Sequence, residues 1–514
     1  MSSNKSANLN EITEKYNQGI GTLLWQRRID DIETPISAFA KLGAEKFGSC
    51  LFESVEGGEN RGRYSIVASN PDLLFSVEGR AANLTEIDES GVFGKATNID
   101  GNPLDALKKL LDENKLDFPS FLPSPLAGLY GYVGYEMVRF YEKLPIAARD
   151  PLELPYSMLM RPRLVIVFDG VKQEMILATP IRPKDGIDAA TAIATGQKLI
   201  DETIAKLSQP NPLKAPDTSK PTYFADISSN QTPAQYMAGV EKARAHIRAG
   251  DIFQVVPSQR FSIDFDKSPL ALYRALRRTN PSPFLFILQM NGFSIIGSSP
   301  EILVRLRDGT VTVRPIAGTR PRGETQAKDL ALEEELLNDP KEVAEHLMLL
   351  DLGRNDVGRV SINKAHSNQE RNTNFAGGIR VTQKFVIERY SHVMHIVSNV
   401  EGTLKPELTA LDALLAGFPA GTVSGAPKIR AMEIISELEP HERGIYAGGV
   451  GYFSANGDMD ICIALRTGVL KDNKLYIQAG AGVVLDSDPE KEHLECIAKS
   501  RALVSAASEA VIYE

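Results

Sequence analysis

The feature that most constrains the fold is a polar segment at residues 208–222, which separates two parts of different character. Four prolines stand there among Ser, Asn, Asp and Lys residues, a composition typical of a surface linker. Short β-rich runs dominate before it, and helices mix with strands after it. The sequence therefore predicts an N-terminal subdomain at residues 20–207, a linker at 208–222 and a second unit at 223–508.

Local patterns predict individual elements on both sides of this segment. Asp169 and Gly170 form a hairpin turn signal between two apolar runs. Thr232 and Gln235 form a capping box, and Gly250 ends the helix that they begin. Further helices are expected at residues 340–352, 428–438 and 489–506, and strands at 163–168, 172–178, 252–257 and 474–478.

Charge and cysteine content narrow the possible partners and the compartment. The formal net charge of −9 argues against nucleic acid and against anionic membranes as partners. The N-terminus is polar, and the apolar runs have the length of strands, so no secretion signal and no membrane span is expected. The three cysteines (Cys50, Cys462 and Cys496) are too few and too scattered for a disulfide framework. We expect a cytoplasmic protein.

Residues 315–323, PIAGTRPRG, carry the first signal of chemistry. A turn bounded by prolines brings together a glycine, the hydroxyl of Thr319 and two guanidinium groups. This combination suits an anionic small molecule better than it suits core packing.

Two pairs of carboxylates form the second signal. Glu342 and Glu345 lie three residues apart in one expected helix, and Glu492 and Glu495 repeat that spacing in the last. Facing pairs could hold Mg²⁺, which prefers one or two protein carboxylates together with waters. Spacing alone leaves open the alternative that these residues simply solvate two helix faces.

Two glycine-rich segments follow. Residues 421–428, GTVSGAPK, differ from a nucleotide-binding loop because a proline intrudes and no Ser or Thr follows the lysine. They still bring hydroxyls to the start of a helix, where a carboxylate can bind. Gly480 and Gly482 would let backbone amides approach a ligand closely. A tight turn without a ligand is the alternative in both places.

Three isolated polar residues complete the candidates. His395 lies in an apolar run and is either a buried neutral imidazole or a general base. Glu301 follows an apolar strand, and burial there would raise its pKa. Arg466 is a charge within an expected apolar strand, and a substrate carboxylate would supply its partner.

In their order along the chain these motifs resemble those of the chorismate-utilising enzymes, and within that family the large subunits (component I) of anthranilate synthases. The resemblance covers about residues 230–505 through five segments. They are PIAGT at 315–319, DLGRND at 351–356, GTVSGAPK at 421–428, GIYAGGVGY at 444–452 and QAGAG at 478–482. The N-terminal third matches more loosely, through LFES at 51–54 and GYVGY at 131–135.

The resemblance implies an α+β fold, a large multi-layer unit in which antiparallel β layers are flanked by helices and two subdomains are intertwined. Residues 223–508 would then be the chorismate-binding catalytic domain. It also implies a lyase reaction: ammonia adds to C2 of chorismate, the C4 hydroxyl leaves, and pyruvate is eliminated to give anthranilate for tryptophan biosynthesis.

Roles for the site residues follow from the same resemblance. Mg²⁺ would be held by Glu345 and Glu495, with Glu342 and Glu492 in support. Glu301 would protonate the departing hydroxyl, and His395 would assist pyruvate elimination. The expected substrate-binding residues are Gly318, Thr319, Thr422, Tyr446, Arg466, Gly480, Gly482 and Lys499.

Two positions separate this chain from relatives with other products. Aminodeoxychorismate synthases carry a nucleophilic lysine where this chain has Ala317, and a methyl group cannot take that role. Isochorismate synthases place a lysine base where this chain has Gln254, whose amide lacks the basicity needed to activate water. Gln254 favours ammonia as the nucleophile, and both residues favour anthranilate as the product.

The resemblance also implies two partners. No glutaminase signature surrounds any cysteine, so a separate glutamine amidotransferase subunit would supply ammonia in a hetero-oligomer. L-Tryptophan would inhibit from a site between the subdomains. Its expected residues are Ser54, Arg63, Pro283, Leu285, Phe286, Tyr452 and Cys462. The alternatives are an aminodeoxychorismate synthase component I, an isochorismate synthase, or a non-catalytic regulatory subunit that binds an amino acid.

Overall fold

The computed structural model describes residues 6–56, 60–222, 226–362, 375–376, 378–390 and 393–514. Its α-helices are α1 Leu9–Asn17, α2 Pro35–Gly43, α3 Pro103–Glu113, α4 Ala189–Leu207, α5 Pro233–Arg248, α6 Pro269–Thr279, α7 Gln326–Asn338, α8 Pro340–Val360, α9 Ala410–Gly417, α10 Lys428–Leu438 and α11 Pro489–Glu509.

The longer strands of the first part are β1 Thr22–Ile29, β2 Cys50–Glu53, β5 Tyr64–Glu78, β6 Ala81–Glu86, β7 Thr97–Ile99, β8 Gly128–Val133, β9 Ser157–Asp169 and β10 Glu174–Ile181. Those of the second part are β13 Ser258–Asp264, β14 Phe284–Gln289, β15 Ser294–Ser299, β16 Ile302–Arg307, β17 Thr310–Val313, β18 Ile316–Pro321, β20 Ile379–Arg389, β21 Val393–Thr403, β23 Gly449–Ser454, β24 Met459–Ile463, β25 Thr467–Lys471 and β26 Lys474–Gly480. Two-residue strands are β3 Val55–Glu56, β4 Asn60–Arg61, β11 Ser228–Ser229, β12 Gln254–Val255, β19 Phe375–Ala376 and β22 Gly425–Ala426, and short 3₁₀ turns are η1 Ser124–Leu126, η2 Tyr135–Phe140, η3 Gly421–Val423 and η4 Ala510–Tyr513.

Two long strands, β5 and β9, join two antiparallel layers. They pair from Tyr64 opposite Asp169 to Val77 opposite Ser157. At one end of this pair the sheet continues through β10 to β1 and through β2, β14, β15, β25, β26 and β13 to β11. At the other end it continues through β6 to β7 and through β8, β23, β24, β16 and β17 to β21, which also pairs with β18 and β20.

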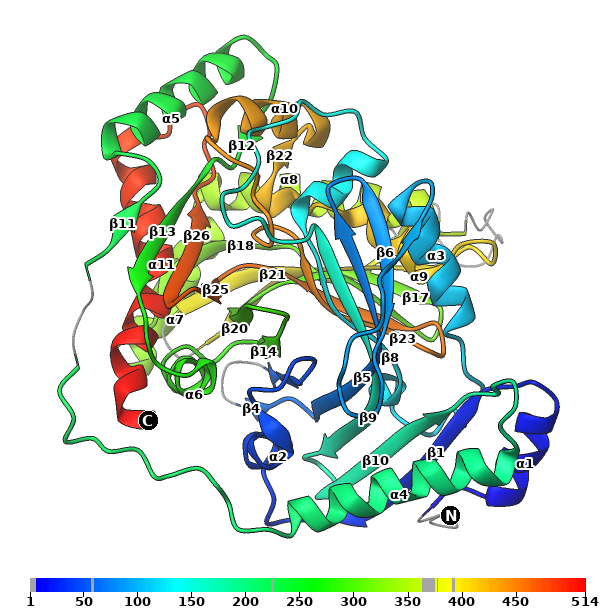
Figure 1. The fold of residues 1–514 in the computed structure, drawn as a ribbon. Helices are drawn as coiled ribbons and strands as arrows, with labels where there is room; N and C mark the ends of the chain where they lie inside the picture. Colours follow the sequence, from blue (N-terminus) through cyan, green and yellow to red (C-terminus); the bar gives the residue numbers. More distant parts are fainter. Residues whose placement is uncertain (1–5, 57–59, 223–225, 363–374, 377, 391–392) are drawn as a thin grey trace.

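Strands from both sides of the 208–222 segment belong to the same layers. β2 pairs with β14, and β8 pairs with β23 along its whole length. The segment itself runs outside helices and strands over the surface (Figure 1). The two parts of the chain are therefore intertwined, which confirms the α+β fold of antiparallel layers expected from the sequence.

The main cores follow from the period-two alternation of the strands. On β9, Val165 and Val167 face the core shared by the two layers, whereas Leu164 and Ile166 face a core beneath α2, α4, α6 and α11. A third core lies between the second layer and helices α3, α8 and α9. The helices thus cover the outer faces of both layers (Figure 1).

Most local predictions are confirmed. The hairpin of β9 and β10 turns at residues 170–173, and α5 has the capping box of Thr232 and Gln235. Helices α8 and α11 run beyond the predicted ends, to Val360 and Glu509. The strand predicted at 252–257 is too long, since only β12 pairs, as a two-residue partner of β22. No helix among the described residues combines the length and the apolar character that crossing a bilayer requires.

Candidate active site and interior cavity

The PIAGTRPRG motif forms β18, and this strand organises the site. Its pairing with β21 shifts register between Ala317 and Thr319, where Gly318 has a φ of +78° that favours glycine. The shift places Thr319 opposite His395, with Thr319 Oγ1 2.9 Å from His395 Nδ1. The carbonyl oxygen of Gly318 lies 3.3 Å from the same nitrogen.

His395 is a buried imidazole that stays neutral at physiological pH. Burial, the largest cause, and the charge of Arg466 lower its pKa to about 4, and the contact with Gly318 opposes this shift. The ring of Tyr390 packs edge-on against it, with 5.7 Å between the ring centroids. A neutral imidazole can accept a proton, so the base predicted from the sequence has the required protonation state.

The pKa of Glu301 is shifted in the opposite direction, upward. It lies between β15 and β16 and is only 6% exposed. Burial raises its pKa to about 8, and the nearby Thr422 hydroxyl and Ile316 amide offset part of that rise. The Glu301 carboxyl is therefore mostly protonated near neutral pH and can act as an acid. Glu301 lies near the Ile316 amide and His395 lies opposite Thr319, so both adjoin β18. Their pKa values are raised and lowered respectively, a pattern typical of acid–base sites.

Arg466 corrects one prediction from the sequence. It does not lie within a strand but between β24 and β25, at a φ of +46°. Burial lowers the pKa of its guanidinium. Among the described residues no carboxylate forms a salt bridge with it, which leaves a largely buried cation available for an anionic ligand.

The four glutamates come from α8 and α11, as the spacing predicts. Burial raises the pKa of Glu345, and the charges of Glu342 and Glu495 raise it further, while Gln254 and Lys499 oppose this rise. Burial also raises the pKa of Glu492, with Glu495 contributing. Four carboxylates that repel one another in a partly buried place would be stabilised by a cation.

The donor set fits Mg²⁺. The donors are carboxylate oxygens alone, which hard cations prefer. In the described ranges, no three acid, imidazole or thiol groups are arranged as a complete set of metal ligands. A magnesium ion that keeps several waters and uses one or two carboxylates needs no such set. Glu345 and Glu495 would hold it, and Glu342, paired with Arg320 at 3.3 Å, would lie beside it.

Glycines bring the remaining predicted residues to these carboxylates. A Cβ atom at Gly482 would lie 2.6 Å from Gln254 Nε2, and the same nitrogen lies 3.2 Å from Glu345 Oε1. A Cβ at Gly480 would lie 2.8 Å from the Tyr446 hydroxyl. Lys499 Nζ donates to the Gly480 carbonyl at 3.0 Å and pairs with Glu495 at 2.8 Å. The residues predicted to bind substrate and metal therefore gather around β18, α8 and α11.

Two buried polar atoms in this site have no hydrogen-bond partner among the described residues. They are the side-chain oxygens Oε1 of Gln254 and Oγ1 of Thr422, the latter lying near the Glu301 carboxyl without a well-aligned hydrogen bond. Buried polar atoms are nearly always hydrogen-bonded, so such an atom calls for a ligand or water. Gln254 is only 2% exposed, and its oxygen is an acceptor next to the carboxylate cluster.

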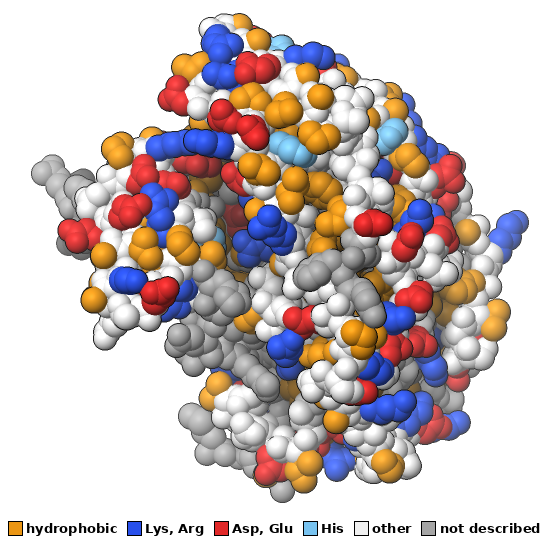
Figure 2. Space-filling view, turned by 90° about the vertical axis from the view of Figure 1, so that its left-hand side faces the viewer, with side chains coloured by type: hydrophobic (Ala, Val, Ile, Leu, Met, Phe, Trp, Pro, Cys, Tyr) orange, Lys and Arg blue, Asp and Glu red, His pale blue; other side chains and the backbone are white. Residues whose placement is uncertain are grey.

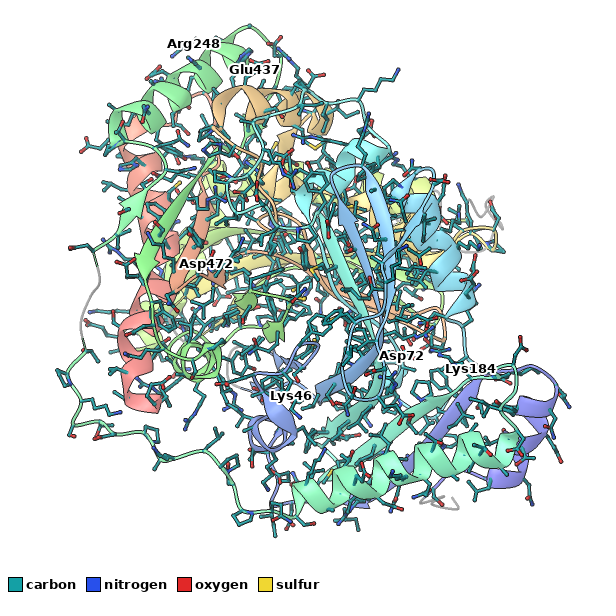
Figure 3. The ribbon with its side chains drawn as sticks, in the orientation of Figure 1. Lys46, Asp72, Lys184, Arg248, Glu437 and Asp472 are labelled. Carbon is teal, nitrogen blue, oxygen red and sulfur yellow. The ribbon has the colours of Figure 1, made fainter. Side chains whose placement is uncertain are left out.

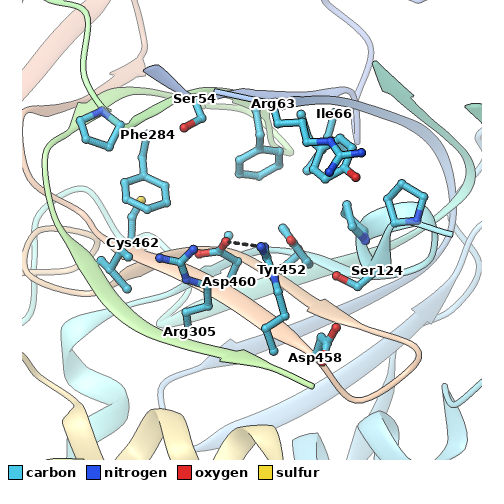
Figure 4. Close-up of a pocket in the computed structure, with 18 of the residues that line it drawn as sticks. Ser54, Arg63, Ile66, Ser124, Phe284, Arg305, Tyr452, Asp458, Asp460 and Cys462 are labelled. Carbon is cyan, nitrogen blue, oxygen red and sulfur yellow. Dashed lines mark ion pairs between the residues drawn. The ribbon is translucent and has the colours of Figure 1, made fainter. Parts of the chain in front are cut away.

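A cavity of about 780 Å³ lies between the two layers (Figure 4). All seven residues predicted to bind an amino-acid inhibitor line it: Ser54, Arg63, Pro283, Leu285, Phe286, Tyr452 and Cys462. Arg63 is held by an ion pair with Asp169 at 2.9 Å. Tyr452 and Cys462 come from adjacent strands on the opposite wall from Ser54.

Sequence reasoning missed several charged residues of this cavity. Arg305 and Asp460 point into it from β16 and β24, and Arg307 forms an ion pair with Asp460 at 3.5 Å (Figure 4). Glu53 also lines the cavity and is held by Arg277 at 2.7 Å. A charge within an apolar strand was the available signal for Arg305 and Asp460. Ile316 also lines the cavity, so the cavity borders β18, the strand that contains Gly318 and Thr319.

The three cysteines are all buried. Burial raises the pKa of Cys50 and Cys462 strongly and that of Cys496 to about 11. None of them has the exposed thiolate that glutamine hydrolysis requires.

Comparison with known proteins agrees with this geometry. The chorismate binding enzyme family matches residues 51–505. The chain is 51% identical to anthranilate synthase component 1 of Cereibacter sphaeroides over 97% of both chains, and 44% identical to that of Acinetobacter calcoaceticus, again over 97% of both. The crystal structure of anthranilate synthase component I from Streptococcus pneumoniae has a TM-score of 0.72 at 38% identity, covering 93% of this chain and 98% of that one. The menaquinone-specific isochorismate synthase MenF of Escherichia coli shares the fold, with a TM-score of 0.69 at 19% identity over 97% and 98% of the two chains. The chain belongs to the chorismate binding enzyme family.

Proposed function

We propose that the protein is an anthranilate synthase component I, a lyase that converts chorismate and ammonia to anthranilate and pyruvate in tryptophan biosynthesis. The observation that carries this proposal is the orphaned Oε1 of Gln254, a buried acceptor beside the carboxylate cluster. An N–H group of ammonia can donate the hydrogen bond that this oxygen lacks. The side-chain amide of Gln254 is not basic enough to activate water instead. The similarity to relatives of that name over nearly the full chain supports the same conclusion.

The chain's own groups divide the reaction between them. Protonated Glu301 donates its proton to the C4 hydroxyl, which leaves as water while ammonia forms the bond to C2. In the second step neutral His395, its Nδ1 held by Thr319 and Gly318, accepts the C2 proton as the C3–O bond breaks and the enolpyruvyl group leaves. That group becomes pyruvate when it takes up a proton.

The carboxylate groups of the substrate have positively charged partners in the site. Arg466 supplies a guanidinium that is free of carboxylate partners in the described structure, and we assign the enolpyruvyl carboxylate to it. Mg²⁺ on Glu345 and Glu495 would supply charge neutralisation for the ring carboxylate. Thr422, Tyr446 and the amides near Gly480 and Gly482 would hold the ring. Ala317, beside Gly318, offers no nucleophile, which closes the covalent route to aminodeoxychorismate.

A glutamine amidotransferase is the partner that best fits the rim of the site. Four exposed apolar residues adjoin active-site segments: Phe253 precedes Gln254, Ile429 lies on α10, Leu485 follows Gly482, and Leu494 lies on α11. Figure 2 shows the side of the molecule that lies on the left of Figure 1, where hydrophobic groups gather beside a hollow that contains charged side chains. A subunit docked there would deliver ammonia without passage through bulk water, and the assembly would be a hetero-oligomer.

L-Tryptophan is the inhibitor that we assign to the interior cavity. The volume falls within the range of small-molecule sites, and aromatic, apolar and charged walls suit an aromatic amino acid.

The buried thiols agree with a reducing compartment, for which we propose the cytoplasm. Side chains throughout the fold are drawn in Figure 3.

The reaction is tested by incubating the purified chain with chorismate, Mg²⁺ and a high ammonium concentration. Anthranilate fluorescence that disappears with a chelator supports the proposal. Chorismate consumed without fluorescence would indicate an aminodeoxychorismate or isochorismate synthase. Intact chorismate would indicate a regulatory subunit without catalytic activity.

A further inference from the structure

Behind the substrate-facing residues lies a buried arginine that the mechanism above does not use. The Arg443 side chain is 1% exposed, and that of its partner Glu439, four residues earlier at the end of α10, is 4% exposed. Arg443 Nε and Nη2 donate to the Glu439 carboxylate at 3.0 and 2.6 Å. Glu439 in turn accepts the backbone amide and the hydroxyl of Ser258, both at 2.8 Å.

The guanidinium also binds two backbone carbonyls from segments far apart in the sequence. Nη1 donates to the Val423 carbonyl at 2.7 Å, and Nη2 donates to the Val256 carbonyl at 2.6 Å. Val423 directly follows Thr422, and Val256 lies two residues after Gln254. One planar group therefore fixes the distance between the segments that carry the two orphaned oxygen atoms of the site.

The same guanidinium packs against two aromatic rings, one of which belongs to the site residue Tyr446. Its central carbon lies 5.3 Å from the ring centroid of Tyr446 and 4.9 Å from that of Tyr135. The Tyr446 hydroxyl reaches the backbone at Gly480, and Gly480 pairs with Ser258 across β26 and β13. The guanidinium therefore contacts the segments of Val256, Val423 and Tyr446 directly. Through Glu439 and Ser258 it is also connected to the segment that contains Gly480 and Gly482.

We propose that Arg443 is a positioning residue, whose guanidinium sets the relative placement of the separate segments that bind chorismate. This inference rests on the proposed function, because it needs a substrate that contacts those segments together. A lysine could not replace the arginine. Its three donors share one nitrogen and cannot span two carbonyls and a carboxylate in one plane. A hydrophobic residue would leave Glu439 as a buried charge without its partner.

The test compares Arg443→Lys with the wild type in the ammonia-dependent reaction. A misplacement of about 1 Å in a site can cost about 10²-fold in rate, so we expect kcat/KM for chorismate to fall on that scale. We expect a higher KM to contribute to the fall. A purely structural role would reduce kcat in proportion to the folded fraction measured by circular dichroism and leave KM unchanged. That result would overturn the inference.

Two further variants make the test specific. Arg161→Lys alters another two-pronged arginine–carboxylate pair, with Asp72 at 2.6 and 3.1 Å, remote from the proposed site, and we expect an unchanged KM. If Arg443→Lys fails to fold, Glu439→Gln is measured in its place. This substitution keeps the side-chain volume and weakens the interaction that orients the Arg443 guanidinium. A raised KM supports positioning, and an unchanged KM contradicts it. Wild-type protein that leaves chorismate intact would refute the proposed function itself, which distinguishes that failure from a failure of the inference.

Discussion

Thr319 and His395 face each other across a register shift, with 2.9 Å between the hydroxyl oxygen and the imidazole nitrogen. The contact holds one ring nitrogen in place and leaves the other for the substrate. Because burial keeps the imidazole neutral, His395 is available as a base over the whole physiological pH range. In the proposed mechanism Glu301 is the acid, so we expect its deprotonation to determine the alkaline limit of activity.

Replacing Glu301 with glutamine tests this acid. We expect Glu301→Gln to lower kcat by about 10²–10⁴-fold, the usual contribution of a positioned acid. Wild-type activity should fall as pH rises through about 8, where the carboxyl loses its proton.

The same variant has a signature in stability. The folded state keeps the Glu301 proton up to about pH 8, whereas the unfolded state releases it near the ordinary value of 4.5. Wild-type stability due to this group therefore falls as pH rises between those values. In urea titrations, the free energy of unfolding of Glu301→Gln minus that of the wild type should therefore increase as the pH rises from 4.5 to about 8. A constant difference would contradict a raised pKa.

Gln254→Leu tests the ammonia acceptor. Loss of one hydrogen bond to the nucleophile should raise the KM for ammonium by about 10-fold, with chorismate binding little changed. Gln289→Leu is the matched control, because Gln289 is also buried and also has an orphaned side-chain atom, but lies on β14 outside the site. An equal effect of both variants would contradict the role given to Gln254.

Glu345→Gln tests the metal site. In chelator the variant should be at least as thermally stable as the wild type, since the substitution relieves repulsion from Glu342 and Glu495. Added Mg²⁺ should raise the melting temperature of the wild type and not that of the variant. Glu490→Gln, at an exposed position of the first turn of α11, should respond to Mg²⁺ as the wild type does. A full Mg²⁺ response in Glu345→Gln would place the ion elsewhere.

Local chemistry made much of the site predictable. The register shift needs a glycine at position 318, and the i,i+3 spacing on α8 and α11 places carboxylates on one helix face each. The position of Arg466 was not predictable in this way, because its left-handed backbone between two strands depends on how β24 and β25 are placed. The Arg443–Val256 contact spans 187 residues of sequence and leaves no local periodicity. Pairings such as β8 with β23 are likewise set by long-range packing.

Ser54→Phe tests the cavity as the tryptophan site. A phenyl ring there would occupy part of the space between the layers, so inhibition by L-tryptophan should weaken by about 10-fold or more while basal activity remains. Ser90→Phe, on an exposed turn, is the control and should be inhibited as the wild type is. Undiminished inhibition of Ser54→Phe would place the inhibitor outside this cavity.

Ile429→Asp tests the proposed docking surface for an amidotransferase subunit. A charge in an apolar contact is costly to desolvate, so glutamine-dependent activity with the partner should fall by about 10-fold or more. Activity with free ammonia should stay unchanged. Ile146→Asp, at an 82% exposed position, is the matched control. Equal losses with glutamine and with ammonia would show damage to the active site instead of the interface.

The most direct measurement follows the nitrogen atom from ammonia to product. Purified chain, chorismate and Mg²⁺ are incubated with ¹⁵N-labelled ammonium, and the products are identified by mass spectrometry. We predict ¹⁵N-labelled anthranilate and unlabelled pyruvate in equal amounts, and neither product when a chelator is present. Chorismate converted to an unlabelled isomer, or to a labelled amine without release of pyruvate, would contradict it.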